Sequence, residues 1–278
     1  MGSIRRIEVP RPASVAALSD KRRGRGRRWC AAALLVVLMS ATGCSVTVAG
    51  AARPPANLTP RSLDGQALNR VLLGRSALSR IVKQPLEPDP RFPPLVGGPE
   101  LLAGTGTGWS DSCLAVAVMM QAGAYRSANV KGFALTTWRP DAGSAVTVTR
   151  VQEAAISLPT AAVANALFAT VSRQWQECDG KTVPISGGSL PLKVQVSHVQ
   201  NAVSVVAATI SMRWNTPTLF SPPSLPAARA VGVRDNCLIE VEVDFFGTPG
   251  ASPDAQGDVN SSALDIAQVM RDKVSALS

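Results

Sequence analysis

The sequence has little of the chemistry that most enzymes and metal proteins use. Its 278 residues include one histidine and five cysteines, and only 4% are aromatic. His198 is the single candidate for a catalytic imidazole, and no GxSxG motif accompanies it, which disfavours a serine hydrolase. A metal site needs several converging His, Cys or acidic ligands, which one histidine and scattered cysteines do not supply. We therefore expect no catalytic residue, no metal site and no cofactor.

The sequence also lacks an apolar run long enough to span a membrane. The run at residues 29–39 follows a strongly basic segment and precedes the small residues 40–43. This order is typical of a signal peptide, because a spanning helix needs about 20 apolar residues. Cys44 follows directly, so we interpret residues 1–43 as a lipoprotein signal peptide and Cys44 as the acylated membrane anchor. The alternative is an ordinary cleavable signal with a cysteine nearby by chance.

The excess of positive charge belongs mostly to that signal. Residues 1–28 hold nine of the 28 basic residues and two of the 19 acidic ones, so the chain from Cys44 onward has 19 basic and 17 acidic residues. A nucleic-acid partner, which the overall charge of +9 suggests, loses its main support. Residues 44–60 are small and contain prolines, which indicates a flexible tether before a domain at residues 61–278.

Hydrophobic periodicity predicts an α+β domain. Apolar residues at helical spacing predict helices over residues 62–83, 159–180 and the C-terminal segment, whereas residues 84–108 are rich in proline and indicate an irregular loop. Short turns between the β-prone segments indicate an antiparallel sheet covered by about three helices. The predicted strands span residues 113–120, 133–138, 145–158, 192–199, 203–214, 228–233 and 238–246.

The last of these predicted strands alternates between apolar and acidic residues. Leu238, Val241 and Val243 interleave with Glu240, Glu242 and Asp244. Strands with this pattern commonly bury one face and expose the other. We therefore expect the carboxylates of this strand to face solvent.

Several motifs together resemble one family. A helix end of the form WxxCxG stands at residues 175–180, Cys113 precedes its cysteine by 65 residues, and Tyr125 follows Cys113 by twelve. With Leu158-Pro159 before the helix and Arg234-Asp235-Asn236 near the C-terminus, they resemble the PknH-like extracellular sensor domain. The start of the mature chain at residues 44–50 similarly resembles mycobacterial lipoproteins.

The resemblance implies an antiparallel sheet with flanking helices around a central cleft that binds a small ligand outside the cell. We expect Tyr125 or Trp138 in the cleft wall, the alternative for each ring being a place in the core. The chain is then a lipid-anchored envelope lipoprotein with a ligand-binding sensor domain on the extracytoplasmic side, and it is not an enzyme. The alternative is a structural or interaction lipoprotein that docks other envelope proteins and binds no small ligand.

Three cysteines remain once Cys44 carries lipid. Exported proteins form disulfides, and three thiols allow three pairings. The resemblance favours Cys113–Cys178 as a staple between an apolar segment and a helix end, with Cys237 free; the alternative is Cys178–Cys237. Family members usually have a second disulfide, near residues 227–228 and 244–245. Neither position is cysteine here, so we expect that bond to be missing.

Overall fold

A single antiparallel sheet organises the domain. The computed structural model describes residues 61–102, 113–143, 147–185, 192–214, 224–246 and 262–278. Across the described sheet of nine strands, the spatial order is β1-β3-β4-β9-β8-β7-β6-β5, and β2 also pairs with β3. The strands are β1 (Leu86–Pro88), β2 (Leu95–Gly97), β3 (Gly132–Pro140), β4 (Val148–Ser157), β5 (Thr182–Ile185), β6 (Leu192–Ala202), β7 (Val205–Trp214), β8 (Leu225–Arg234) and β9 (Cys237–Phe245).

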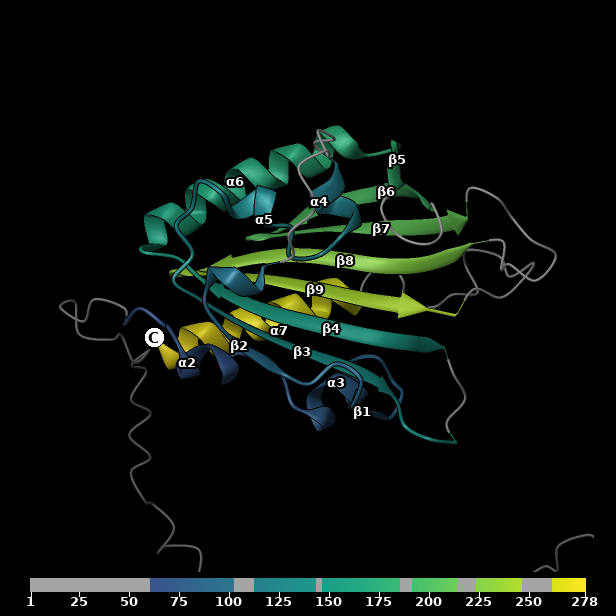
Figure 1. The fold of residues 1–278 in the computed structure, drawn as a ribbon, viewed down its shortest axis with the longest axis horizontal. Helices are drawn as coiled ribbons and strands as arrows, with labels where there is room; N and C mark the ends of the chain where they lie inside the picture. The colour runs from purple at the N-terminus through teal and green to yellow at the C-terminus, as the bar shows by residue number, and fades with distance from the viewer. Residues whose placement is uncertain (1–60, 103–112, 144–146, 186–191, 215–223, 247–261) are drawn as a thin grey trace, which may run out of the picture. The chain divides into compact units, whose positions relative to one another are not determined.

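Helices cover both faces of this sheet. One face, here called the α6 face, is covered by α6 (Ala161–Cys178) and the short helices α4 (Leu114–Ala117) and α5 (Ala122–Tyr125). The opposite α7 face is covered by α7 (Ser262–Leu277), α2 (Gln66–Asn69) and α3 (Arg75–Ile81). Figure 1 shows α6 along β6–β8 and α7 passing behind β9 and β4. The predicted α+β class, with three main helices (α3, α6 and α7) on an antiparallel sheet, is confirmed.

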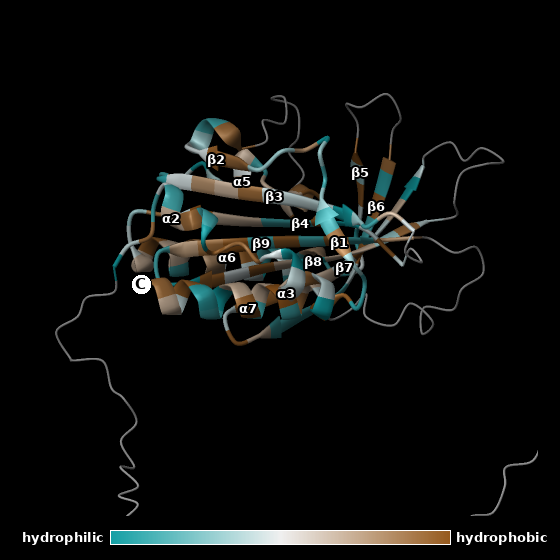
Figure 2. Cartoon of the chain, turned by 90° about the horizontal axis from the view of Figure 1, so that it is seen from below, coloured by the Kyte–Doolittle hydropathy of each residue, from teal (hydrophilic) through white to brown (hydrophobic). Residues whose placement is uncertain are grey.

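The two long helices follow directly from the sequence. The Thr160 side chain caps α6 by accepting a hydrogen bond from the Val163 amide at 3.2 Å, and Gly180 follows its end with φ +76°. One stripe of α6 is buried, comprising Ala164, Leu167, Val171, Trp175 and Cys178. Figure 2 shows brown and teal residues alternating along α7, as expected of an amphipathic helix on a sheet. No helix in the described ranges is long and apolar enough to cross a membrane.

A buried asparagine closes one end of the sheet. Asn236, in the β8–β9 turn, exchanges hydrogen bonds with both backbone groups of Leu63 at 3.0 Å. Its side chain also donates to the Leu158 carbonyl at 3.1 Å. The start of the domain, the end of β4 and the β8–β9 hairpin are therefore joined by one side chain.

The predicted helix over residues 62–83 is wrong as a single element. The structure divides it into α2 and α3, and Gly74 before α3 has an extended backbone. Between the two helices the Leu73 amide donates to the Glu153 carboxyl group at 2.8 Å instead of to a helical carbonyl. A long-range hydrogen bond therefore overrides the helical periodicity at this point.

The predicted strand over residues 113–120 is also wrong. It begins with helix α4 and ends at Met120, which has φ +60° and whose amide donates to the Glu240 carboxylate at 3.1 Å. Within the segment predicted as a loop, β1 and β2 pair with β3. Three-residue strands at the sheet edge tolerate proline, which explains why composition did not reveal them.

Candidate functional site

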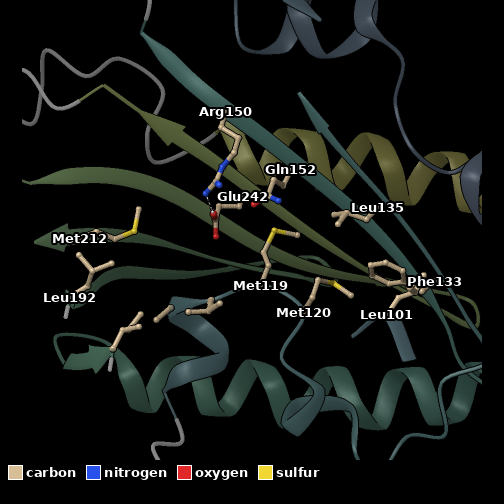
Figure 3. Close-up of a pocket in the computed structure, with 13 residues that line it drawn as sticks. Leu101, Met119, Met120, Phe133, Leu135, Arg150, Gln152, Leu192, Met212 and Glu242 are labelled. Carbon is tan, nitrogen blue, oxygen red and sulfur yellow. Dashed lines mark hydrogen bonds and ion pairs between the residues drawn. The ribbon is translucent and has the colours of Figure 1, made fainter. Parts of the chain in front are cut away.

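A pocket lies on the α6 face between the sheet and the segment that follows α4. Its volume is about 420 Å³, within the range of small-molecule sites. Figure 3 shows side chains from η1 (Pro99–Leu101), the α4 segment and several strands pointing toward one space. The lining residues are Leu101, Ala117, Val118, Met119, Met120, Phe133, Leu135, Arg150, Gln152, Ile185, Leu192, Met212 and Glu242.

The lining of the pocket is mostly apolar. Three thioethers, from Met119, Met120 and Met212, contribute to its wall. Methionine side chains are flexible and polarisable, so such a wall adapts to apolar ligands of different shapes. The three polar lining residues, Arg150, Gln152 and Glu242, come from β4 and β9. Gln152 is the register partner of Glu242, so these groups lie together on the sheet rather than around the rim.

A buried ion cluster continues from the pocket under the helices. Arg229 of β8 is fully buried, and its guanidinium lies 3.2 Å from Glu240 and 3.3 Å from Glu242. It also donates to the Ala115 carbonyl at 3.1 Å and lies 5.8 Å from the centre of the Trp175 ring. Because a buried charge is tolerated only when paired and hydrogen-bonded, these contacts fix α4 and α6 relative to the sheet.

A second arginine connects this cluster to the pocket. Arg150, which lines the pocket, lies 3.2 Å from Glu242 and 2.7 Å from Asp244 through the same nitrogen. Burial and, after it, the Glu242 charge raise the pKa of Asp244 to about 7. The cluster therefore contains a carboxyl group that exchanges its proton near neutral pH.

The predicted solvated face of the last strand is wrong. Glu240 and Glu242 are 4% and 7% exposed. The Met120 amide and the Tyr125 hydroxyl donate to Glu240, and two arginines pair with the carboxylates. The alternation itself is correct and places both carboxylates on one side of β9. That side meets a buried ionic layer instead of water.

The two aromatic residues predicted for a cleft wall lie on opposite faces of the sheet. Tyr125 belongs to the core of the α6 face, where its hydroxyl donates to Glu240 and burial raises its pKa well above the usual value. Trp138 belongs to the core of the α7 face. Neither ring lines the pocket described above, so both take the alternative place in the core.

Trp138 helps to define a separate buried carboxyl group. Its indole nitrogen donates to Glu153 at 3.1 Å, and the Leu73 amide donates to the other oxygen at 2.8 Å. Burial, partly offset by these two donors and by the charge of Lys273, raises the pKa of Glu153 to about 8. The α7 face thus carries one buried acid near a single lysine, whereas the α6 face carries a network of acids and arginines in direct contact.

The disulfide joins Cys113 and Cys178, with Cα atoms 5.6 Å apart. Cys237 is free and buried, and burial raises its pKa to about 12, which makes it an unreactive core residue. This pairing is the one predicted from the resemblance, and it links the start of α4 to the end of α6. The segment bearing Met119 and Met120 is therefore held close to α6.

The positions expected for a second family disulfide face each other in this chain. Ala227 of β8 is the register partner of Asp244 of β9. The resemblance placed two half-cystines at this part of the sequence, and the chain has an alanine and an aspartate instead. The aspartate pairs instead with Arg150 of β4, on the other side of β9 from Ala227.

The remaining candidate for chemistry, His198, is exposed. It has φ +54° at an irregularity between β6 and β7, and its ring contacts the Ser197 hydroxyl at 3.2 Å. Within the described residues no group of three or more His, Cys, Asp or Glu side chains is placed to hold a metal ion. Cys44 and the predicted tether lie outside the described residues.

Sequence reasoning missed most of the pocket. Met119 and Met120 were assigned to a strand, and Met212, Arg150 and Gln152 were not singled out. A signal was present in β8, where Arg229 stands among small apolar residues, and in β9, where acids recur at every second position. Charged residues in strands as apolar as these indicate a buried ionic layer.

Comparison with known proteins agrees with this fold. A model of the PknH-like extracellular domain matches residues 63–273, which is more than half of the chain. The chain belongs to this family. The resemblance drawn from the cysteine and helix-end motifs is thereby confirmed for the domain.

Two solved structures are similar to this chain. The extracellular domain of PknH from Mycobacterium tuberculosis aligns with a TM-score of 0.62 and 17% identity, over 78% of this chain and 100% of that one. At this identity the likeness shows the fold alone. An uncharacterized protein from Mycobacterium smegmatis aligns at a TM-score of 0.31 and 11% identity, over 72% of this chain and 96% of that one. A TM-score this low does not indicate a shared fold. A search of curated proteins gave no significant match.

Proposed function

We propose that this chain is a lipid-anchored protein of the cell envelope whose extracytoplasmic, sensor-type domain binds a small ligand. The observation that carries the proposal is the pocket on the α6 face, an apolar cavity of about 420 Å³ with three polar side chains together on its sheet side. This combination of apolar walls and a few fixed polar groups is typical of ligand sites. Family membership supports an extracellular setting.

The alternative, a lipoprotein that docks other proteins, expects a contiguous exposed apolar patch. Large apolar side chains exposed among the described residues are distributed over separate elements: Phe92 and Leu95 before and in β2, Val203 between β6 and β7, Phe246 after β9 and Val269 on α7. This scatter favours the ligand-binding proposal. We also propose that the domain is not an enzyme, since its single histidine is exposed and contacts a serine hydroxyl. We propose that it binds no nucleic acid, since the chain from Cys44 onward has 19 basic and 17 acidic residues.

The membrane partner in this proposal is the lipid on Cys44. Cys44→Ala removes the residue that carries the acyl chains, so the mature protein should move from the membrane fraction to the soluble fraction. The shift should be large, because two or more acyl chains anchor a protein far more firmly than a single chain does. Cys30→Ala, within the apolar run of the signal, is the matched control and should leave the protein membrane-bound. Unchanged fractionation of the Cys44 variant contradicts lipid anchoring.

The ligand is tested by mass spectrometry of molecules extracted from the natively purified protein. Leu135→Trp fills part of the pocket from β3 and should abolish co-purification of the ligand. Leu264→Trp introduces the same change at a partly buried site on the α7 face and should retain it. Equal recovery from both variants, or no small molecule from the unmodified protein, contradicts ligand binding in this pocket.

A further inference from the structure

The pocket and its ion cluster contain unequal numbers of opposite charges. Three carboxyl groups, those of Glu240, Glu242 and Asp244, lie side by side on β9. They share two guanidinium groups, those of Arg229 and Arg150. The cluster therefore has one acid more than it has bases, and Glu242 at its centre lines the pocket.

The described neighbours supply one further cation, Arg139 of β3, whose charge Glu87 balances at 2.6 Å, so the surplus of one acid remains. Leu192 and Met212 line the pocket, so the alternation of strands places their neighbours Lys193 and Arg213 on the other face of the sheet. Tyr125 contributes a neutral hydroxyl as a donor to Glu240. The segments between residues 103 and 261 that the structure does not describe contain three aspartates and neither lysine nor arginine in their sequence.

The surplus acid has a physical consequence. Asp244 faces Arg150 on β4, Glu242 on its own strand and Ala227 on β8, and burial beside Glu242 raises its pKa to about 7. A proton thus compensates the surplus charge at neutral pH. A cation in the pocket beside Glu242 provides the same compensation. An anion in the pocket would be repelled by the Glu242 carboxylate. Arg150 offers it little compensation, because that guanidinium already pairs with Glu242 and Asp244.

We propose that the pocket binds a small amphiphilic cation, with its alkyl part against the methionine and leucine wall and its ammonium-type head beside Glu242. This inference rests on the proposed function and names its ligand class. Lipophilic amines and quaternary ammonium compounds have this chemistry. Fatty acids and other amphiphilic anions do not.

Three probes that share an eight-carbon alkyl group and differ in the charge of the head group test the charge preference separately from pocket binding. Octyltrimethylammonium, 1-octanol and octanoate are titrated calorimetrically, below micelle formation, into the full chain carrying Cys44→Ser, with the disulfide formed. The cation should bind at least about tenfold more tightly than octanol, given the strength of a partly desolvated charge pair, and octanoate should bind most weakly. The affinity for the cation should rise between pH 6 and pH 8 as Asp244 loses its proton, since the quaternary head does not titrate.

The outcomes distinguish the charge preference from ligand binding in the pocket. Octanol or octanoate binding as tightly as the cation overturns the charge preference and leaves the apolar pocket standing. Binding of none of the three overturns both. Glu242→Gln should reduce the cation-to-octanol preference to about twofold or less, whereas Asp235→Asn, in a pair with Arg234 at the β8–β9 turn, should retain it. If the Glu242 variant does not fold, the pH series on the protein with Glu242 intact tests the charge preference: an affinity for the cation that does not rise between pH 6 and pH 8 overturns it.

Discussion

The two faces of the sheet solve the same packing problem in different ways. On the α7 face, apolar residues of β4, β8 and β9 pack against α7, α2 and α3, and Glu153 is a buried acid hydrogen-bonded to the Leu73 amide and the Trp138 indole. On the α6 face, the same strands present Arg229, Glu240 and Glu242, whose pairs position α4 and leave a pocket. Alternation along each strand permits this division, because successive side chains belong to opposite faces. The first face is filled by apolar packing, whereas the second retains the pocket that we propose as a ligand site.

The largest effect should come from removing the central charge of the α6 face. Arg229→Met leaves two buried carboxylates without their shared partner, and we expect a loss of about 3–5 kcal/mol in the free energy of unfolding. Arg234→Met, on the same strand but in an exposed pair 3.7 Å from Asp235, should cost less than about 1 kcal/mol. Chemical denaturation measures both, and similar costs would show that the cluster is not structural.

The disulfide should contribute nearly as much. Replacing Cys113 and Cys178 by alanine removes a link between residues 65 positions apart, which should lower the free energy of unfolding by about 4 kcal/mol. Cys237→Ala, which changes a free buried cysteine on the α7 face, should cost about 1 kcal/mol. Denaturant unfolding of oxidised protein compares the two, and a disulfide variant as stable as the Cys237 variant would refute the staple.

The buried acid of the α7 face, Glu153, should make stability depend on pH. The pKa of Glu153 is about 8 in the folded protein against 4.5 for a free side chain, so the folded state retains the proton over this range. Stability should therefore be full below pH 4.5 and fall as pH rises toward 8, by roughly 2–4 kcal/mol.

Glu153→Gln should remove its own part of this slope and leave a second part of the same sign from Asp244, whose pKa of about 7 also lies well above its usual value of 3.8. Glu87→Gln is the control, because Glu87 is a partly exposed ion-pair residue and its change should leave the slope in place. Melting temperatures between pH 5 and 8 provide the measurement. If the Glu153 variant keeps the full pH dependence of the unmodified protein, another group causes that dependence and the prediction is wrong.

The smallest effect should come from the pocket wall. Met212→Gln, at a partly buried position facing the pocket, should change the free energy of unfolding by less than about 1 kcal/mol. Met270→Gln, at a fully buried position on the α7 face, should lower the free energy of unfolding by about 1–3 kcal/mol, because it buries an amide among apolar residues. Equal costs at the two sites would mean that the α6 face is packed as closely as the α7 face.

Local sequence signals predicted the elements that have local causes. The helix after Pro159 and the β8–β9 hairpin were found because capping residues, Gly180 and the Arg234–Asn236 turn act over a few positions. The failures have long-range causes. The break before α3 depends on Glu153, and the course of the chain after α4 depends on Glu240, both far away in sequence.

The pocket could not be predicted for the same reason. Its polar residues can be recognised as one site only when β4 and β9 are aligned, because Gln152 and Glu242 are neighbours in the sheet and not in the sequence. Its methionines form a wall because the disulfide and the Glu240 carboxylate hold their segment over the sheet. Family resemblance suggested a cleft but led to Tyr125 and Trp138, which the structure places in the two cores.

The division between a binding face and a packing face is tested most directly by methyl NMR of the methionines. Met119, Met120 and Met212 line the pocket, and Met270 is buried under α7, so the protein contains its own control. In a chain labelled at methionine methyl groups and titrated with 1-octanol, we predict shifts of the three pocket signals and an unchanged Met270 signal. A shift of Met270 without the others, or no shift at all, would contradict the assignment of ligand binding to the α6 face.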